Sequence, residues 1–324
     1  MAFSPDCIAA ELKRFDKYFE GALRTHVPLA DNVIRYFLDR KGKRMRPILV
    51  LLAAKMLKDD LPESVYYGAT ALELLHNATL MHDDVVDQSD ERRGSATINK
   101  VWDNKVAVLM GDFFLAKCLQ SSNATGSLDI SVILSDMVTR LSEGELEQLS
   151  NARSHMLSEE AYFSVISGKT ASLFAACMRV AAYGVGASEA ELEQLAQIGE
   201  LIGLIFQIRD DVFDYFPSTS EIGKPTGHDI MEGKVTLPLL YALQHAPIEE
   251  SSCMRMLLER EEGLSEEDVT TLVEFAAAMG GIEYAQAKMK KMAYEAKKML
   301  SAFPENPARE ALMNLVDYFI VRNK

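Results

Sequence analysis

The sequence has few cysteines, and none of them form a recognisable pair. Cys7, Cys118, Cys177 and Cys253 are its four cysteines, and none shows the C-x-x-C spacing typical of a zinc site. A disulfide framework is not indicated either, because such frameworks occur in short chains that are dense in cysteine. This usage is typical of a reducing compartment, and we expect a cytoplasmic protein.

Long hydrophobic runs are also missing. The first residues include Glu11, Lys13 and Arg14 where a signal peptide has its apolar core. No stretch of about 18 apolar residues, the length that spans a bilayer, occurs in the chain. We therefore predict no transmembrane segment and at most peripheral contact with a membrane.

Basic residues are outnumbered by acidic ones. The chain has 34 Lys and Arg against 48 Asp and Glu, which gives a net charge of -14. Nucleic-acid binding needs an excess of positive charge to neutralise phosphates. The composition therefore argues against nucleic acid, and any anionic ligand must bind a local basic cluster.

What the sequence does contain is typical of a helical globular protein. Of its 324 residues 48% are apolar and 25% are charged, and no long linker interrupts them. Apolar residues recur at three- and four-residue intervals, as at Leu192, Leu195, Ile198 and Ile202. We predict one all-α domain over 1–324, with roughly ten or more helices.

One helix stands out in this pattern. Ser188-Glu189-Ala190-Glu191 resembles a capping box, and the segment 196–209 that follows is almost wholly apolar. We predict a long helix that starts at this box and is buried on most sides in the centre of a bundle. Breaks in the helical pattern fall at 41–42, 58–62, 94, 121–127, 184–188, 217–227, 280–281 and 304–307.

Two aspartate motifs of the form D-D-x-x-D follow apolar helices. They are Asp83-Asp84-Val85-Val86-Asp87 and Asp210-Asp211-Val212-Phe213-Asp214. Residues four apart share a helix face, so the outer carboxylates of each motif point together. Mg²⁺ prefers oxygen ligands and bridges one or two carboxylates to substrate phosphates. A single motif could be a solvated acidic face, but two copies emerging from apolar helices favour cation clamps that face one cavity and hold a diphosphate.

Basic residues near the breaks supply the positive charge that the composition lacks overall. They are Lys43, Arg44, Arg46, Arg92, Arg93, Lys169, Lys224 and Lys234. Their positions beside breaks that adjoin the aspartate motifs predict phosphate binding.

Taken together, these motifs resemble those of the trans-polyprenyl diphosphate synthases. The matching segments are Gly42-Lys43-Arg44-Met45-Arg46-Pro47, His82 to Asp87, Arg92-Arg93-Gly94, Gly168-Lys169-Thr170, Phe206 to Asp211 and Gly233-Lys234. They span about 40–240 in the order found in that family. The resemblance implies the isoprenoid synthase fold, which is a single-domain bundle of long helices around a central cavity, and a homodimer.

The resemblance also implies roles for individual residues. Isopentenyl diphosphate would bind Lys43, Arg46, His76 and Arg93, and an allylic diphosphate would bind Arg92, Lys169, Thr170, Gln207, Lys224 and Lys234. The principal ligands of about two to three Mg²⁺ ions would be Asp83, Asp87 and Asp210, with Asp84 and Asp214 as lesser or water-mediated ligands. From the chemistry of the residues themselves, we expect the oxygen dipoles of Thr170 and Gln207 to steady the allylic cation. No side chain stands out as a base, so we expect the departing diphosphate to accept the proton that is lost.

Two small residues predict a long product. In the family an aromatic residue four or five positions before the first aspartate stops growth early, and here those positions hold Thr79 and Ala78. Each open helical turn admits roughly one more isoprene unit, so we expect about thirty to fifty carbons, with octaprenyl as the central value. The primer would be farnesyl or geranylgeranyl diphosphate, and the product would serve quinone side chains and leave through peripheral membrane contact. Leu74, Leu75, Leu119, Ser121 or Ser122 could form a deeper floor.

Several alternatives stay open at this point. A shorter-chain geranylgeranyl or farnesyl diphosphate synthase would share every motif. A terpene cyclase would need no second diphosphate site, and a non-catalytic partner subunit would be free to lose its carboxylates. Glu73 and His76 form one E-x-x-H motif, whereas a di-iron bundle needs two. The segment 98–119, with Val106, Leu109, Met110 and Phe113, is either core or a dimer interface.

Overall fold

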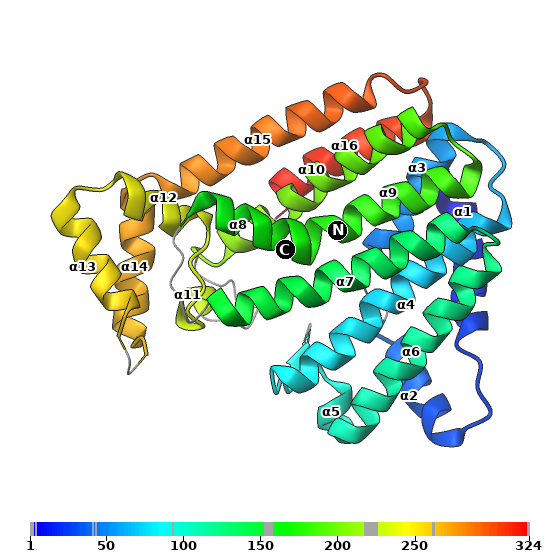
Figure 1. Cartoon of the computed structure of the whole chain (residues 1–324), viewed down its shortest axis with the longest axis horizontal. Coiled ribbons are helices and arrows are strands. Elements are labelled where there is room, and N and C mark those ends of the chain that lie inside the picture. The colour runs from blue at the N-terminus through cyan, green and yellow to red at the C-terminus, as the bar shows by residue number, and fades with distance from the viewer. Residues whose placement is uncertain are drawn as a thin grey trace. The chain divides into compact units, whose positions relative to one another are not determined.

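The structure is a computed structural model, and its described residues form an all-α protein with one small hairpin (Figure 1). It describes residues 3, 5–40, 42, 44–92, 94–151, 158–216, 226–260 and 263–322, with backbone only for 145 and 147–151. The all-helical prediction is confirmed. The chain divides into two compact units, which are described one at a time. The single domain over 1–324 stays a prediction.

Unit 1 consists of Met1–Asp136, Phe174–Ala196 and Leu300–Met313. It contains η1 (Asp6–Ile8), α1 (Ala9–Ala22), α2 (Pro28–Leu38), α3 (Met45–Leu57), α4 (Glu63–Val86), β1 (Glu91–Arg92), β2 (Ser95–Ala96), α5 (Ile98–Val101) and α6 (Asn104–Ala124). The first turns of α7 (Leu128–Asn151) and of α10 (Glu189–Phe213), most of α9 (Ser172–Val185) and the start of α16 (Pro307–Val321) complete it.

The core of unit 1 forms around α3, α4 and α6. Ten of the thirteen residues of α3 are buried, so this helix has almost no solvent face, and apart from Arg46 and Lys55 its sequence is apolar. α4 and α6 run side by side (Figure 1). Gly68 lets α4 approach α9 closely, because a Cβ there would lie 2.5 Å from Cγ1 of Val180.

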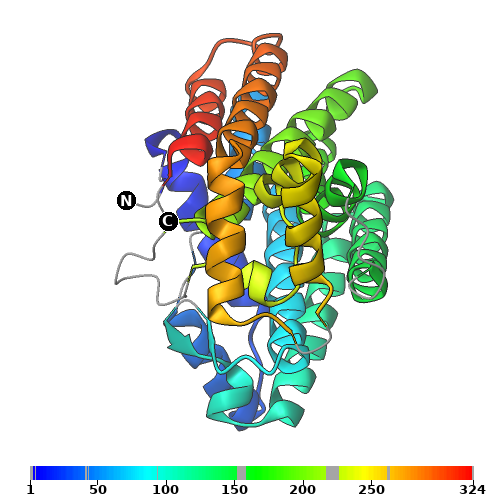
Figure 2. The same cartoon turned by 90° about the vertical axis from the view of Figure 1, so that its left-hand side faces the viewer.

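Unit 2 consists of Met137–Leu173, Gln197–Met299 and Asn314–Lys324. It contains α8 (Glu159–Ile166), the π-helical turn η2 (Ser167–Ala171), α11 (His228–Met231), α12 (Leu237–His245), α13 (Ile248–Leu258), α14 (Glu266–Ala278) and α15 (Gly281–Leu300), with the remaining parts of α7, α10 and α16. α12 contacts both α13 and α14, and the last two lie next to each other in both views (Figures 1 and 2).

The long helix predicted from the capping box is α10. The Ser188 N–H donates to Oε2 of Glu191 at 2.8 Å, and the Glu191 N–H donates to Oγ of Ser188 at 3.4 Å. Every residue from Ile198 to Tyr215 is buried or half-buried. Both the start of the helix and its burial are therefore confirmed, and the helix runs into the second aspartate motif as predicted.

One continuous helical stretch, Glu159–Val185, is long and apolar enough to cross a membrane by length and composition. Of its most apolar 18-residue window, 56% is buried within the described structure. Such burial is typical of a core helix.

Candidate active site

The first aspartate motif lies at the C-terminal end of α4. Asp83 and Asp84 belong to its last turn, and Asp87 is its C-cap residue. The Asp87 N–H donates to the Asp83 carbonyl at 2.8 Å, so these two residues are one helical turn apart. Asp84 is only 7% exposed, whereas Asp83 is half-buried and Asp87 is exposed. The motif thus has one inward carboxylate and two outer ones.

The end of α4 has a defined geometry. The Ser89 N–H donates to the Asp84 carbonyl at 2.9 Å, and the Gln88 N–H donates to the Val85 carbonyl at 3.3 Å. This is the Schellman pair, in which the residue after the cap is left-handed. Gln88 has φ 51, a conformation that costs about 1 kcal/mol without glycine. The amide of Asn99 also donates to the Asp84 and Ser89 carbonyls, at 3.3 and 3.0 Å, which fixes this helix end from outside.

Asp84 forms an ion pair with Arg92. Nε of Arg92 lies 2.6 Å from Oδ1 of Asp84, and the two side chains are 37% and 10% exposed. Burial raises the pKa of the Asp84 carboxyl, and the Arg92 guanidinium opposes this rise. Arg92, predicted to bind the allylic diphosphate, is thus held beside the first motif.

Arg92 is positioned by the β1–β2 hairpin. Arg92 pairs with Ser95, and Gly94 takes the left-handed conformation at φ 73 in the turn. The sequence pattern marked only a break here, because strands of two residues have no periodicity to detect. Arg93 follows Arg92 directly, but it lies outside the described residues.

His82, directly before the first motif, packs against α6. A Cβ on Gly111 would overlap the His82 ring, so only glycine fits at this point. Nε2 of His82 lies 3.3 Å from the Val108 carbonyl and 3.5 Å from Oδ1 of Asp112. This contact joins the motif end of α4 to the N-terminal half of α6.

The predicted isopentenyl diphosphate site is described only in part. Arg46 lies half-buried on α3, and His76 lies half-buried on α4. Burial raises the pKa of the Cys177 thiol to about 12, and the charges of Arg46 and Glu73 have smaller, opposite effects on it. Lys43 is outside the described residues.

Arg44, which adjoins that predicted site, has another partner. It precedes α3 in a left-handed conformation with φ 51, and its guanidinium lies 2.5 Å from Oδ1 of Asp16 on α1.

The second aspartate motif lies at the C-terminal end of α10 in unit 2, where Asp211 is the centre of a hydrogen-bond network. The Tyr162 hydroxyl donates to Oδ2 of Asp211 at 2.6 Å, and Nε2 of Gln207 donates to Oδ1 at 2.8 Å. The Thr170 hydroxyl donates to Oε1 of Gln207 at 2.7 Å. Thr170 and Gln207, which the sequence predicted as neighbours in function, are therefore in direct contact.

Burial governs the protonation of this network. Asp211 is 4% exposed, and burial raises its pKa to about 7, although the bonds from Tyr162 and Gln207 oppose the rise. Burial also raises the pKa of Tyr162 well above its usual value. Sequence analysis missed Tyr162, and it assigned no role to Asp211. Tyr162 lies in the sequence 49 residues away from its partner, so no local pattern could connect them.

Lys169 and Thr170 lie on the π-helical turn η2. π turns inside α-helices are rare and frequent at functional sites. The Ser172 hydroxyl donates to the Gly168 carbonyl at 2.6 Å, and the Ser167 hydroxyl donates to Glu200 on α10. The widened turn sets the direction of Thr170 toward Gln207.

Asp214 caps the short helix α11. Its Oδ1 and Oδ2 accept the backbone N–H groups of His228 and Asp229, each at 2.9 Å. Burial raises the pKa of Asp214. The structure therefore gives Asp214 a structural contact, and its role as a lesser metal ligand stays a prediction.

Lys234, just after α11, lies near acidic groups of its own unit. Its Nζ is 2.6 Å from Oε2 of Glu232 and 3.7 Å from Oδ1 of Asp229. Lys224, the other lysine predicted for the allylic diphosphate in this region, lies outside the described residues.

Asp210 is paired with an arginine that sequence analysis did not single out. Nη2 of Arg322 donates to Oδ1 of Asp210. The arginine side chain is 5% exposed and the aspartate side chain is 40% exposed. The outer carboxylate of the second motif is therefore more open to solvent than its partner.

The two residues predicted to set product length lie about one turn from the middle of α4, on the side of its C-terminal end. Ala78 is 2% exposed, and Thr79 is half-buried, with its hydroxyl bonded to the His76 carbonyl at 2.9 Å. Of the residues predicted for a deeper floor, Leu74, Leu75, Ser121 and Ser122 are buried, whereas Leu119 is 59% exposed.

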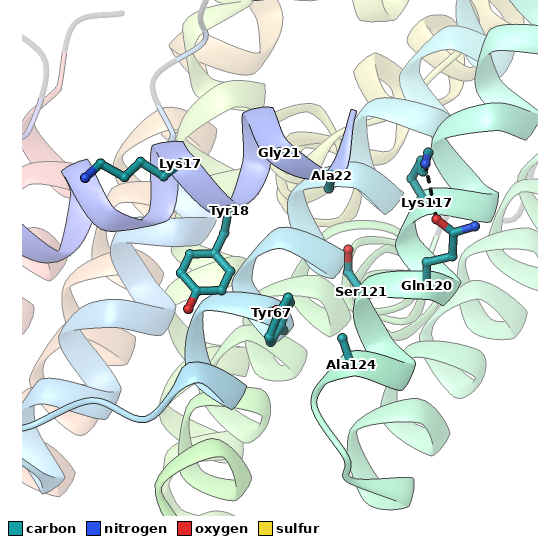
Figure 3. Close-up of a pocket in the computed structure, with 9 residues that line it drawn as sticks. All are labelled: Lys17, Tyr18, Gly21, Ala22, Tyr67, Lys117, Gln120, Ser121 and Ala124. Carbon is teal, nitrogen blue, oxygen red and sulfur yellow. Dashed lines mark hydrogen bonds between the residues drawn. The ribbon is translucent and has the colours of Figure 1, made fainter. Parts of the chain in front are cut away.

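A pocket of about 460 Å³ opens in unit 1 between α1, α4 and α6 (Figure 3). Tyr18 and Tyr67 lie on one side of it, and Lys117 and Ser121 lie on the other. Tyr67 and Ala78 are eleven positions apart, which places them on the same face of α4 about three turns apart. Ser121, a predicted floor residue, lines this pocket.

The donor chemistry of both motifs fits a hard divalent cation. Among the described residues, no three His, Cys, Asp or Glu side chains converge as a complete cage. Mg²⁺ does not need one, because it keeps waters and shares one or two carboxylates with substrate phosphates. Partly exposed carboxylates at the ends of two helices, as at Asp83 and Asp210, suit that mode of binding.

Comparison with known proteins identifies the class. Residues 27–276 match the family model described as polyprenyl synthetase. The chain is 35% identical over 313 residues to an octaprenyl diphosphate synthase of Haemophilus influenzae, covering 97% of this chain and 94% of the relative.

Solved structures extend this to the whole fold. A geranylgeranyl pyrophosphate synthase of Bacteroides thetaiotaomicron is 40% identical, with a TM-score of 0.83 and 97% of each chain covered. A polyprenyl synthase of Caulobacter crescentus, complexed with calcium and isoprenyl diphosphate, is 32% identical, with a TM-score of 0.89, covering 100% of this chain and 99% of that one. The fold is the isoprenoid synthase fold, as predicted.

The chain belongs to the polyprenyl synthetase family. It is a trans-prenyltransferase that makes polyprenyl diphosphates, and the family acts with a divalent metal.

Proposed function

We propose that this chain is a Mg²⁺-dependent synthase that condenses isopentenyl diphosphate with farnesyl or geranylgeranyl diphosphate to a long all-trans product, with octaprenyl as the expected length. The observation that carries the proposal is the pair of small residues, Ala78 and Thr79, beneath the outer carboxylates of the first motif. Relatives with octaprenyl products support the length.

The aspartates divide the work in this proposal. Asp83, Asp87 and Asp210 would hold about two to three Mg²⁺ ions, which neutralise the charge of the departing diphosphate. Asp84 keeps Arg92 beside the motif through its 2.6 Å ion pair. Asp211 holds Gln207 in a fixed orientation, and Gln207 in turn accepts the hydroxyl of Thr170. These oriented amide and hydroxyl dipoles are placed to stabilise a developing cation without reorganisation.

The basic residues complete the proposal. Lys43, Arg46, His76 and Arg93 would bind isopentenyl diphosphate, and Arg92, Lys169, Lys224 and Lys234 would bind the allylic diphosphate with Thr170 and Gln207. Two diphosphate sites separate this enzyme from a terpene cyclase. A cyclase turns over farnesyl diphosphate alone, whereas we expect no product until isopentenyl diphosphate is added.

The first experiment measures activity and product size together. Purified chain is incubated with labelled isopentenyl diphosphate and each of geranyl, farnesyl and geranylgeranyl diphosphate, with Mg²⁺ or with a chelator. We expect products of about thirty to fifty carbons that require Mg²⁺. Activity that survives chelation contradicts the metal proposal, and a product that stops at twenty carbons favours the shorter-chain alternative, which the geranylgeranyl synthase relative supports.

A substitution at Thr79 tests the length determinant separately. Thr79 is only half-buried, so Thr79→Phe adds an aromatic ring with little overpacking of the core and should shorten the product by one or more isoprene units. Ala78→Phe should do the same at a greater cost in stability, since Ala78 is 2% exposed and overpacking costs about 1–3 kcal/mol. An unchanged product ladder in both variants contradicts the geometry.

We also propose that the chain forms a homodimer through α6. Leu109 and Leu119 are 66% and 59% exposed on this helix, and Leu128 at the start of α7 is 78% exposed. Met110, which the sequence placed among the interface candidates, is 5% exposed and belongs to the core. Light scattering should show a dimer, and Leu109→Glu should shift the mass toward the monomer.

A further inference from the structure

Arg322 is held beside the second aspartate motif by several contacts. It follows the last residue of α16, and its side chain is 5% exposed. Nη2 donates both to Oδ1 of Asp210 and to the Phe206 carbonyl, the second at 3.1 Å.

Aromatic rings and a second arginine fix this guanidinium in place. Its central carbon lies 4.1 Å from the centre of the Phe206 ring and 5.6 Å from the ring centres of Phe213 and Phe319. The backbone carbonyl of Arg322 accepts Nε and Nη2 of Arg209 at 3.0 and 2.8 Å. The guanidinium is therefore a fixed positive charge, because moving it would break cation–π contacts and hydrogen bonds at once.

The ion pair between Asp210 and Arg322 is asymmetric in its exposure to solvent, and this matters for the binding of a cation. Asp210 has 40% of its side chain exposed and Arg322 has 5%, so the carboxylate can be reached from solution while the guanidinium lies behind it. A cation that binds Asp210 meets a like charge within a few ångströms. A diphosphate bound with the cation supplies negative charge that compensates this repulsion.

We propose that Arg322 is a positioning residue that orients the Asp210 carboxylate and lowers its affinity for a divalent cation until a diphosphate is present. This inference rests on the proposed role of Asp210 as a metal ligand. It makes cation and diphosphate binding cooperative at the second motif, and it assigns a role to a residue 112 positions away from Asp210 in the sequence.

The test measures Mn²⁺ binding to the purified full chain without substrate. The electron paramagnetic resonance signal of free Mn²⁺ reports how much metal stays unbound. The variants are Arg322→Met, which keeps an unbranched stem among the rings, Asp210→Asn, and the double variant. We expect Arg322→Met to bind one Mn²⁺ about five- to tenfold more tightly than the parent chain. In the Asp210→Asn background the same substitution should change nothing, and inorganic diphosphate should increase Mn²⁺ affinity less in Arg322→Met than in the parent chain.

The direction of the change excludes a merely structural effect, because a disturbed site binds metal more weakly. Arg322→Lys keeps the charge and should behave like the parent chain. Arg309→Met, which removes another largely buried arginine of α16 that donates to the Phe303 carbonyl, should leave Mn²⁺ affinity unchanged.

Unchanged or weaker Mn²⁺ binding in Arg322→Met, or equal tightening in the Asp210→Asn background, overturns the proposal. If the parent chain is active and metal-dependent, but its Mn²⁺ titration superimposes on that of Arg322→Met, only the proposed role of Arg322 is rejected. A parent chain that makes no product with any divalent metal rejects the proposed function instead.

Discussion

The two aspartate motifs share one sequence pattern but differ in the partners of their middle residue. Asp84 and Asp211 are both buried, at 7% and 4% exposure. Asp84 is paired with a guanidinium, whereas Asp211 receives a phenol hydroxyl and a side-chain amide. A full positive charge opposes the effect of burial on a carboxylate more strongly than neutral donors do. The same D-D-x-x-D pattern can therefore hold its middle aspartate in two different protonation states.

The outer carboxylates differ as well. Asp87 caps α4 and is exposed, whereas Asp214 caps the next helix with both oxygens. In the second motif, Asp210 is the outer carboxylate that lies partly open, and it carries an arginine behind it. The first motif therefore leaves Asp83 partly exposed and Asp87 exposed, whereas each of the three carboxylates of the second motif accepts a hydrogen bond from its own unit.

The largest effect is expected from the outer carboxylates of the first motif. Asp83→Asn combined with Asp87→Asn removes two anionic oxygen ligands and should lower kcat by about 10³-fold or more. The melting temperature should stay within a degree or two, because Asp87 is exposed and Asp83 is only half-buried. Steady-state kinetics and thermal unfolding measure the two quantities.

Asp90→Asn is the matched control for that variant. Asp90 lies three residues beyond the motif and forms an exposed ion pair with Lys100 at 2.7 Å. Its substitution should leave kcat unchanged. A loss of kcat in the motif variant that is accompanied by an equal loss of folded protein would show that the carboxylates serve the fold and not the reaction.

Some of the site was predictable from sequence because local spacing determines it. Four residues on a helix bring Asp83 near Asp87, and the capping box at Ser188 sets where α10 begins. The almost wholly apolar segment 196–209 predicted the burial of α10, which the structure confirms from Ile198 to Tyr215. All of these features depend on residues within a turn or two of each other.

Other contacts have no local signal. Tyr162 and Arg322 meet their aspartates across 49 and 112 positions, and each looks like an ordinary apolar-helix tyrosine or surface arginine in the sequence. The π-helical turn at Ser167–Ala171 and the two-residue strands beside Gly94 are too short to show a period. These features follow from tertiary packing, so only coordinates reveal them.

The second prediction concerns the pH dependence of stability in chelator. Folding raises the pKa of Asp211 from 3.8 to about 7, so between these values the folded chain keeps a proton that the unfolded chain has lost. The free energy of unfolding should therefore fall as pH rises through this window. Asp211→Asn removes this contribution. Between pH 5 and pH 8, the free energy of unfolding of the variant should therefore fall by about 3 kcal/mol less than that of the parent chain. Denaturant unfolding across the pH range measures the slope.

Asp90→Asn is the control for the pH experiment, because Asp90 is exposed and is not part of the Asp211 network. Its slope should match that of the parent chain. Parallel slopes for Asp211→Asn and the parent would show that Asp211 keeps an ordinary pKa in the folded chain, and the contrast between the two middle aspartates would disappear.

The third prediction removes the phenol from the Asp211 network. Tyr162→Phe leaves Oδ2 of Asp211 buried without its 2.6 Å hydrogen bond and should lower the free energy of unfolding by about 2 kcal/mol. Tyr284→Phe is the matched control, because the Tyr284 hydroxyl also donates to a carboxylate, that of Glu159 at 2.7 Å, at a less buried position. Equal losses in the two variants would mean that burial of the network adds nothing.

The smallest effect is expected from the ion pair between Asp84 of the first motif and Arg92. Arg92→Met leaves the Asp84 carboxylate without its 2.6 Å ion pair, but the guanidinium is 37% exposed, so water screens part of the interaction. The free energy of unfolding should fall by about 1 kcal/mol at pH 7. It should recover at acidic pH, since burial raises the pKa of Asp84 and a protonated carboxyl needs no counter-charge. Lys100→Met, which breaks the exposed pair with Asp90, should leave the free energy of unfolding unchanged both at pH 7 and at acidic pH. A loss of unfolding free energy in Arg92→Met that persists at low pH would mean that Arg92 stabilises the hairpin by packing. The Asp84 carboxylate would then not depend on the charge of Arg92.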